Sequence, residues 1–111
     1  MHDLSKLLIT LSEDCTIRLW DLEICNQVYE FSFSNEDRCN VISSCPNGMF
    51  FAAGFKSGIH RIFDIENTSI IFEGKYHDAE ICSIEYSPDG RQLVVGDCKQ
   101  VYKIYDVVRD Y

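Results

Sequence analysis

The chain has 111 residues, of which 46% are hydrophobic and 25% are charged, and its formal net charge is −8. This length and composition are those of one small folded domain, and they exclude a disordered chain. A phosphate backbone and an anionic membrane surface both attract basic proteins, so this acidic chain is not expected to bind nucleic acid or membranes. The acidic balance instead suits solubility, or a partner protein with a basic patch.

The sequence carries no sign of a targeting segment, a spanning segment or a metal site. Residues 1–14 lack the basic start and small-residue cleavage site of a signal peptide, and no apolar run is long enough to cross a bilayer. The six cysteines form no C-x-x-C pair, and the three histidines lie far apart in the sequence. We therefore expect a cytoplasmic protein with free thiols, no bound metal and no cofactor.

Short segments of alternating apolar residues, rich in β-branched and aromatic side chains, follow one another along the chain. In order, strands are predicted at residues 6–11, 16–20, 27–31, 40–44, 50–54, 58–63, 69–73, 81–86, 92–96 and 100–105, with a further strand starting at 107–111. Turns are predicted at Pro-Asn-Gly, residues 46–48, and Pro-Asp-Gly, residues 88–90, because proline presets φ and glycine accepts a positive φ. No segment shows a sustained helical stripe, so the chain is predicted to be all-β.

The segments repeat. "LITLSEDCTIRLWD", "FAAGFKSGIHRIFD" and "LVVGDCKQVYKIYD" each end in an aromatic residue followed by aspartate. The aromatic residues Trp20, Phe63 and Tyr105 are separated by steps of 43 and 42 residues, and Asp21, Asp64 and Asp106 keep the same steps. Because Gly54 and Gly96 also lie 42 residues apart, several residue types recur in one register. Such a period is typical of a repeat architecture in which each unit is one supersecondary element.

A repeat of about 40–45 residues with four strands that ends in Trp-Asp resembles the WD-repeat β-propeller family. This resemblance implies an all-β propeller fragment of about two and three-quarter blades, each blade a four-stranded antiparallel sheet. The expected blades are residues 1–33, which lack the first strand, 34–75, and 76–111, whose last strand is at most partly present. Because a ring needs roughly four to eight blades, we expect further blades of a longer chain, or self-association, to cover the apolar faces at both ends.

Members of this family often bury a hydrogen-bonded set of His, Ser or Thr, Asp and Trp in each blade. By this resemblance, the first unit keeps Asp14 and Trp20. The second has Asn35 near the His position, and Ser57 and Phe63 at the Asp and Trp positions. The third has His77 but Lys99 at the Asp position and Tyr105 at the Trp position, so no unit is expected to hold the complete set.

The stretches "QVYEF", "RCNV" and "AAGFKSGIHRIF" also resemble WD-repeat proteins of centriole and cilium walls. That resemblance implies a cytoskeletal scaffold at the centriole or cilium, bound to tubulin-based structures.

No catalytic pattern is evident. The residues "GFKSG" lack phosphate-loop spacing and no helix follows them, so they are expected to form a turn. His77 is interpreted as a structural residue, His60 as a residue of the sheet surface, and Cys15 and Cys98 as ordinary turn thiols. An enzyme site in a central channel needs convergent polar groups, whereas the expected inner-strand residues are mainly small or apolar: Val41, Ile42, Ser43 and Ser83. The substrate-receptor alternative is disfavoured because Glu23 and Glu66 stand where the Trp-Asp-x-Arg motif of such receptors has arginine.

The sequence thus favours a non-catalytic protein-binding scaffold that presents its turns to partner proteins. The alternatives are a propeller-type enzyme, a substrate-receptor subunit of a larger complex, or a metal-binding module. In the family that the chain resembles, partners commonly dock on the loops before the first strands and on the turns between second and third strands. The corresponding candidates here are Glu13, Asp14, Asn35, Lys56, Ser57, His77, Asp78, Lys99 and Gln100.

Overall fold

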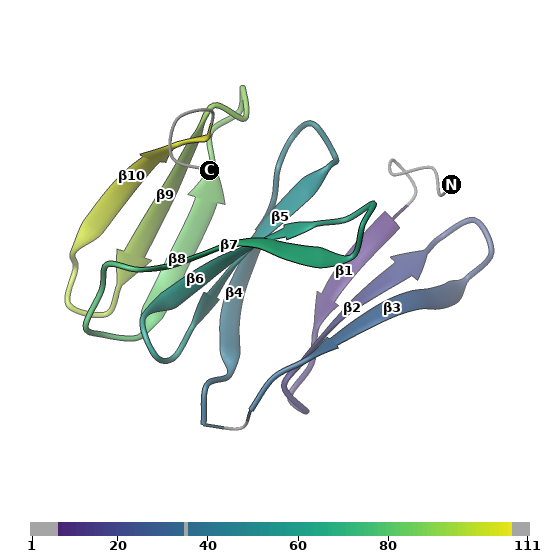
Figure 1. Ribbon diagram of the computed structural model, residues 1–111, viewed down its shortest axis with the longest axis horizontal. Helices are drawn as coiled ribbons and strands as arrows, with labels where there is room; N and C mark the ends of the chain where they lie inside the picture. Colours follow the sequence, from purple (N-terminus) through teal and green to yellow (C-terminus); the bar gives the residue numbers. More distant parts are fainter. Residues whose placement is uncertain (1–6, 35, 108–111) are drawn as a thin grey trace.

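The computed structural model describes residues 7–34 and 36–107, and within them the chain forms three antiparallel sheets (Figure 1). The first sheet contains β1 (Leu7–Leu11), β2 (Thr16–Asp21) and β3 (Asn26–Ser32). The second contains β4 (Cys39–Ser44), β5 (Phe50–Phe55), β6 (Ile59–Asp64) and β7 (Ser69–Lys75). The third contains β8 (Ile81–Tyr86), β9 (Gln92–Asp97) and β10 (Tyr102–Asp106).

The predicted all-β fold is confirmed, and the predicted strands agree with the observed ones to within two residues at each described end. One of the two-residue differences is at Gln100, which was expected to start a strand but lies in a turn with φ of 65°. The predicted Pro-Asn-Gly and Pro-Asp-Gly turns are also present, with Gly48 and Gly90 at φ values of 75° and 73°. The strand expected from residue 107 falls almost wholly outside the described residues.

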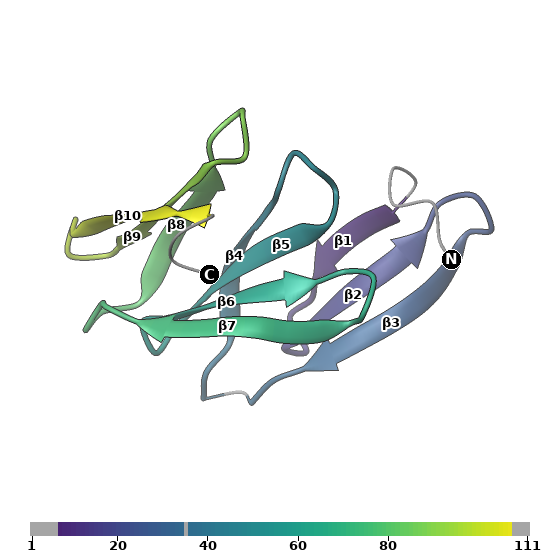
Figure 2. The ribbon, with the colours of Figure 1, turned by 45° about the horizontal axis from the view of Figure 1, so that its top comes forward.

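The three sheets stand beside one another, and the second lies between the first and the third, with a neighbour on each face (Figure 2). The first interface is aromatic: the rings of Phe51 and Phe63 stack at 4.5 Å, and Phe31 of the first sheet lies 4.8 Å from Phe63. The second interface joins residues such as Ile62 of the second sheet to Leu93 of the third, and both are fully buried. Each sheet is thus too thin to bury its own side chains and depends on the next one.

The central strand β5 is buried on both faces. Phe51, Ala52, Ala53 and Phe55 all have 0% exposure, because odd-numbered residues face the first sheet and Ala52 faces the third. This double burial explains why β5 is a continuous apolar run rather than an alternating one.

The expectation that His60 lies on a sheet surface is wrong. His60 has 0% exposure, and its ring lies 4.6 Å from that of Tyr105 in the third sheet. Strand alternation placed His60 on the same face as Ile62, but it could not tell that the third sheet covers this face.

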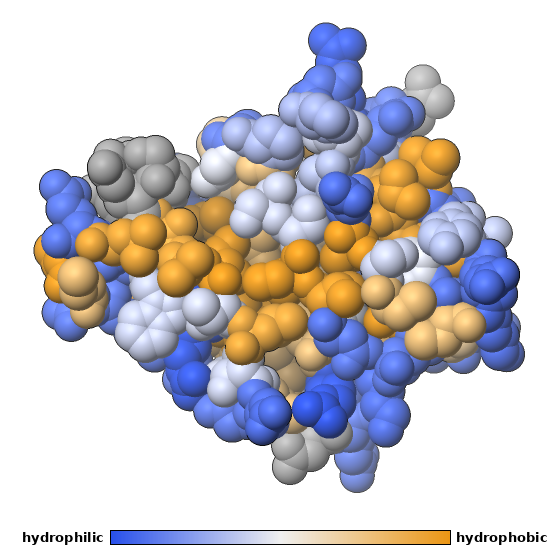
Figure 3. Space-filling model, turned by 180° about the vertical axis from the view of Figure 1, so that it is seen from behind, coloured by the Kyte–Doolittle hydropathy of each residue, from blue (hydrophilic) through white to orange (hydrophobic). Residues whose placement is uncertain are grey.

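The outward faces of the first and third sheets are uncovered. Leu19, Ile62 and Ile104 are separated by the repeat steps of 43 and 42 residues, yet they have exposures of 1%, 0% and 61%. The two buried residues are each covered by the following sheet, whereas none of the described residues covers Ile104. A band of apolar side chains also crosses the side of the molecule opposite to the view of Figure 1 (Figure 3). Among the described residues, no helix is long and apolar enough to span a bilayer.

Candidate functional site: the loop rim

Five connections between strands lie on one side of the three sheets, the lower side in Figure 1. We call this side the loop rim; it consists of residues 12–15, 33–34, 36–38, 56–58, 76–80 and 98–101. Three of the connections are turns within a sheet, and two are the loops that join one sheet to the next. Every sheet therefore contributes to the loop rim.

The three turns of the loop rim share one backbone shape. Cys15, Gly58 and Gln100 occupy the same turn position, with φ values of 67°, 89° and 65°. In each turn the N–H of this residue donates to the carbonyl oxygen three residues earlier, at 3.1–3.2 Å. The repeat thus fixes a left-handed position, which glycine adopts readily and other residues adopt at a cost.

Backbone hydrogen bonds hold the loops between sheets against these turns. Lys56 N–H donates to the carbonyl of Arg38, and Cys98 N–H donates to the carbonyl of Glu80, both at 3.0 Å. The two bonds are related by the 42-residue step. Asp37 adds a third contact, because its Oδ1 accepts from Ser57 N–H at 2.8 Å. The loop rim is therefore a fixed surface rather than a set of independent loops.

A hollow of about 440 Å³ opens on the loop rim where the first and second sheets meet the loop that leads to the third. The predicted residues Glu13 and Lys56 both line it, and so do Arg38 and Glu80. Neither Arg38 nor Glu80 was among the sequence candidates. The signal that could have found them is their 42-residue spacing immediately before the first strands of two units.

Three more candidates gather in a second hollow, which His77, Asp78, Asp97 and Lys99 help to line. His77 is only 1% exposed, and its Nδ1 lies 2.8 Å from Oδ2 of Asp97. Burial raises the pKa of Asp97, but the N–H of Val101, the His77 ring and the N–H of Lys99 together lower it more, so the net pKa is below its usual value. The resemblance placed Lys99 at the aspartate position of this unit, but the aspartate that contacts His77 is Asp97, at the end of β9.

The remaining candidates lie apart from the two hollows. Gln100 is exposed at a turn and Ser57 is half-buried, while Asn35 lies outside the described residues. Asp14 is exposed and is held in contacts within its own sheet.

A third hollow, of about 760 Å³, follows the inner strands and is mostly apolar. Val41 and Ile42 of β4 and Ser83 of β8 line it, as expected for inner-strand residues. Of its lining residues Glu85 alone is a carboxylate, and none is a histidine, cysteine, lysine or arginine. Within residues 7–34 and 36–107, no cluster of three or more metal-ligating side chains is present.

Comparison with known proteins agrees with this geometry. The family "Anaphase-promoting complex subunit 4 WD40 domain" matches residues 6–87. The chain belongs to the WD-repeat family. It is 39% identical to "WD repeat-containing protein 90" of Xenopus tropicalis over 80% of its length, and 34% identical to the human protein of that name over 84%. "Centriole proteome protein 16" of Chlamydomonas reinhardtii is 35% identical over 60% of the chain. The chain spans 3–5% of the length of these three relatives.

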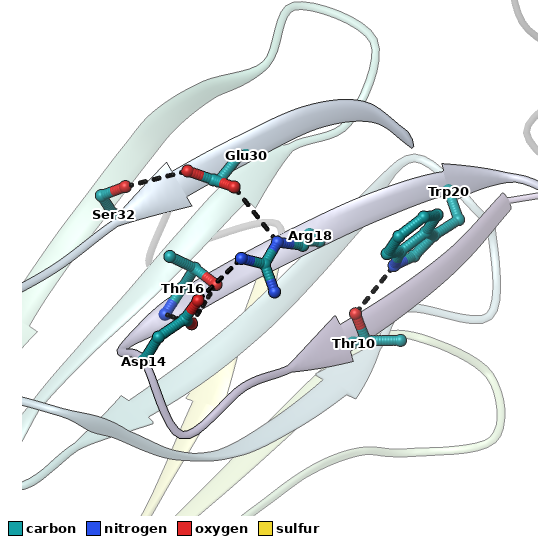
Figure 4. Close-up of polar contacts among 7 residues, drawn as sticks. All are labelled: Thr10, Asp14, Thr16, Arg18, Trp20, Glu30 and Ser32. Carbon is teal, nitrogen blue, oxygen red and sulfur yellow. Dashed lines mark hydrogen bonds and ion pairs between the residues drawn. The ribbon is translucent and has the colours of Figure 1, made fainter. Parts of the chain in front are cut away.

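The first sheet of this WD-repeat chain carries its polar contacts on the uncovered face (Figure 4). Trp20 Nε1–H donates to Thr10 Oγ1 at 2.9 Å, so the tryptophan and hydroxyl members of the family's hydrogen-bonded set are present here. Asp14 accepts from the Thr16 hydroxyl at 2.6 Å and from Arg18 Nη2 at 2.7 Å. These two donors, together with Ser12, lower the pKa of Asp14 to about 2. Arg18 also bonds Glu30, at 3.1 Å, so this face is both polar and aromatic.

The aspartate of the Trp-Asp pair has a local structural role. Asp21 Oδ1 accepts from Glu23 N–H at 2.9 Å, and Asp64 Oδ1 accepts from Asn67 N–H at 3.1 Å. An aspartate that bonds the backbone two or three residues on closes the turn to the outer strand. The aromatic residues before Asp64 and Asp106 are buried between sheets, since Phe63 and Tyr105 have exposures of 0% and 7%.

WD-repeat domains generally act as non-catalytic scaffolds that bind other proteins. The arrangement of this chain suits that role, because stacked sheets hold turns with exposed charged residues at fixed positions on one side.

Proposed function

We propose that the chain is a segment of a protein-binding scaffold and that partner proteins dock on the loop rim. The observation that carries the proposal is the hollow where Glu13, Arg38, Lys56 and Glu80 meet, because these residues come from four separate connections, the first three of which are joined by backbone hydrogen bonds. Charged residues converging on a rigid concave surface favour a specific protein contact over a non-specific one.

The charge of the loop rim favours a partner with a basic segment. The described connections carry six acidic side chains, those of Glu13, Asp14, Glu36, Asp37, Asp78 and Glu80, and three basic ones, those of Arg38, Lys56 and Lys99. The net charge of the whole chain is also negative, at −8. Complementary charge speeds encounter with a basic partner and disfavours an acidic one.

We further propose that this scaffold acts in the cytoplasm, in a centriolar or ciliary assembly built on tubulin. The support is the similarity to "Centriole proteome protein 16" and to "WD repeat-containing protein 90". In that assembly residues 1–33, 34–75 and 76–111 would be successive blades, and further sheets of the same repeat would cover the free faces of the first and third.

Charge reversal on the loop rim tests the binding proposal. The rim variant is Glu13→Lys with Glu80→Lys. The control is Glu23→Lys with Glu66→Lys, which makes the same change of charge at exposed residues of the β2–β3 and β6–β7 turns. Each chain is crosslinked in an extract of ciliated cells, and the crosslinked proteins are identified by mass spectrometry. We expect the control to keep the basic partners of the wild type and the rim variant to lose them. Identical partners for both variants would contradict the proposal.

A separate experiment tests the centriolar assignment. Purified microtubules are pelleted with the wild-type chain, the rim variant and the control. Co-sedimentation of the wild type and of the control supports a tubulin-based site. If no chain pellets while the crosslinked partners still depend on the loop rim, direct binding to tubulin is wrong and the scaffold role stands.

A further inference from the structure

Two exposed cysteines of the third sheet lie on neighbouring segments. Cys82 belongs to β8, and Cys98 follows the end of β9. Ile81 pairs with Asp97 across the two strands, and Cys98 N–H donates to the carbonyl of Glu80 at 3.0 Å. Glu80 and Cys98 are therefore opposite each other. The register shifts between Ile81 and Ser83, which makes Cys82 the extra residue of a β-bulge beside this pair.

The second sheet repeats this arrangement with other residues. Asn40 and Lys56 precede Cys82 and Cys98 by 42 residues. The register of β4 and β5 shifts around Asn40, and Lys56 N–H makes the backbone bond that Cys98 makes in the third sheet. Asn40 and Lys56 line one hollow, so these two repeat positions open on the same space. By the same repeat geometry, Cys82 and Cys98 are expected to lie side by side at the third sheet.

The surroundings of Cys98 agree with this placement. Its Sγ lies 3.9 Å from Oε2 of Glu80. The neighbouring thiol of Cys82 is the largest cause that raises the pKa of Cys98, followed by burial and by the negative charge of nearby groups. Because the pKa of Cys98 is raised, its thiol is expected to be the partner that closes the disulfide rather than the one that reacts first with a peroxide.

From this geometry we propose that Cys82 and Cys98 form a dithiol site that a hydroperoxide converts into an intrachain disulfide. The Cys82 thiolate attacks one oxygen of hydrogen peroxide and becomes a sulfenic acid, while the O–O bond breaks and the other oxygen leaves as water after taking up a proton. The Cys98 sulfur then attacks the sulfenic sulfur, forms the S–S bond and releases the second water. The two thiols are oxidised by two electrons and the peroxide is reduced to two waters.

The other cysteines of the chain provide internal controls. Cys25 is exposed but lies in the β2–β3 turn of the first sheet, where its Sγ contacts the carbonyl of Leu22 at 3.6 Å. Cys15 and Cys45 are buried, and burial raises the pKa of Cys39 to about 12. A peroxide that simply oxidised accessible thiols would modify Cys25 as readily as Cys82.

Peptide mapping of the complete reduced chain tests the proposal. Hydrogen peroxide is added, free thiols are alkylated, and the chain is cut with trypsin. Because Arg91 lies between the two cysteines, trypsin places them in separate peptides, residues 76–91 and 92–99. We expect these two peptides to be joined until a reductant is added and the Cys25 peptide to be alkylated. An alkylated Cys98 peptide, or a disulfide joined to Cys25 instead, would overturn the proposal.

Variants and a second reagent sharpen the result. Cys82→Ser and Cys98→Ser should each abolish the linked peptides, and Cys25→Ser should leave them unchanged. Phenylarsine oxide bridges pairs of close thiols, so the reduced wild type and Cys25→Ser should each bind one equivalent and Cys82→Ser none. The formation rate of the disulfide should also rise with pH as the thiolate becomes more populated. Equal arsenical binding by wild type and Cys82→Ser would show that the two thiols do not act together.

Discussion

At the scale of single residues, the turns of the loop rim hold the backbone of three residues, Cys15, Gly58 and Gln100, in a conformation that favours glycine. Only Gly58 satisfies it, and Gly58 is also needed for space, because an added Cβ would lie 2.3 Å from the His77 carbonyl oxygen. Gln100 holds the same position with an exposed side chain and a φ of 65°. Comparison of the repeats thus locates backbone strain at Gln100.

Replacing Gln100 by glycine should relieve that strain. We expect Gln100→Gly to stabilise the chain by about 0.5–1 kcal/mol, since the left-handed conformation penalises a residue with a Cβ and the added freedom of glycine in the unfolded chain offsets part of the gain. Lys99→Gly, at the exposed neighbouring residue, should have no such benefit. Denaturant titration measures both, and an unchanged or lowered midpoint for Gln100→Gly would contradict the argument.

His60 should make folding sensitive to acid. Burial, followed by the nearby His77, lowers the pKa of His60 from 6.5 to about 4. Between these values the unfolded chain binds a proton that the folded chain does not, so the free energy of unfolding decreases as the pH falls from 6.5 to 4. At 1.36 kcal/mol per pKa unit the loss is about 3 kcal/mol.

The measurement is a denaturant titration at several pH values. His60→Leu, which places an apolar side chain beside Phe72 and Tyr105, should show a smaller loss of stability over this pH range than the wild type. Carboxylates that titrate in the same range are common to both chains, so they cancel in the comparison. Parallel stability curves would show that His60 is not the source.

At the scale of elements, Gly54 shows how closely neighbouring sheets approach, and Gly96 is its counterpart on an uncovered face. They occupy one repeat position on β5 and β9. A Cβ on Gly54 would lie 2.2 Å from Ile81 Cγ2 and 2.8 Å from Ile81 Cβ, both in the adjacent sheet. A Cβ on Gly96 would meet Ser83 Oγ and the Tyr102 ring, each at 2.5 Å, on the uncovered face.

The two glycines should therefore respond differently to alanine. Gly54→Ala forces the second and third sheets apart and should destabilise the chain by about 1–3 kcal/mol, the usual cost of overpacking. Gly96→Ala should cost less, because the exposed Tyr102 side chain can move aside. Thermal unfolding of both variants checks the order, and equal losses would mean that the interface between sheets does not set the cost.

At this scale the sequence predicts the strands and turns, whereas the contacts between sheets are known only from the structure. Alternation and turn residues predicted the strands, because both are local properties. The partner of His77 was missed because alignment on the aromatic residues places Lys99 at the aspartate position, whereas the turn lets Asp97 reach the ring from two residues earlier. The burial of His60 was missed because the period of a strand separates two faces without showing which one a neighbouring sheet covers. Arg38 and Glu80 could have been predicted as candidates from the repeat, since they are separated by its 42-residue step.

At the scale of the whole molecule, the two uncovered faces are complementary by register. The face with Tyr102 and Ile104 corresponds to the faces of the first and second sheets that a following sheet covers. The face with Trp20 corresponds to the faces with Phe63 and Tyr105, which pack on a preceding sheet. When the 111-residue chain is isolated, a second copy offers the missing sheet on either side. Such a head-to-tail contact joins different patches of two copies, so it can continue beyond a dimer.

We therefore expect the isolated 111-residue chain to self-associate. Light scattering under reducing conditions should show a mass that rises with concentration, and Ile104→Lys should lower it, because a charge replaces an apolar side chain at the centre of the contact. Ile24→Lys is the matched control, since Ile24 is 57% exposed against 61% for Ile104 but lies in the β2–β3 turn. An equal fall in mass for both variants would point to non-specific apolar contact. A monomer at every concentration would mean that the free faces do not recognise each other outside a longer chain.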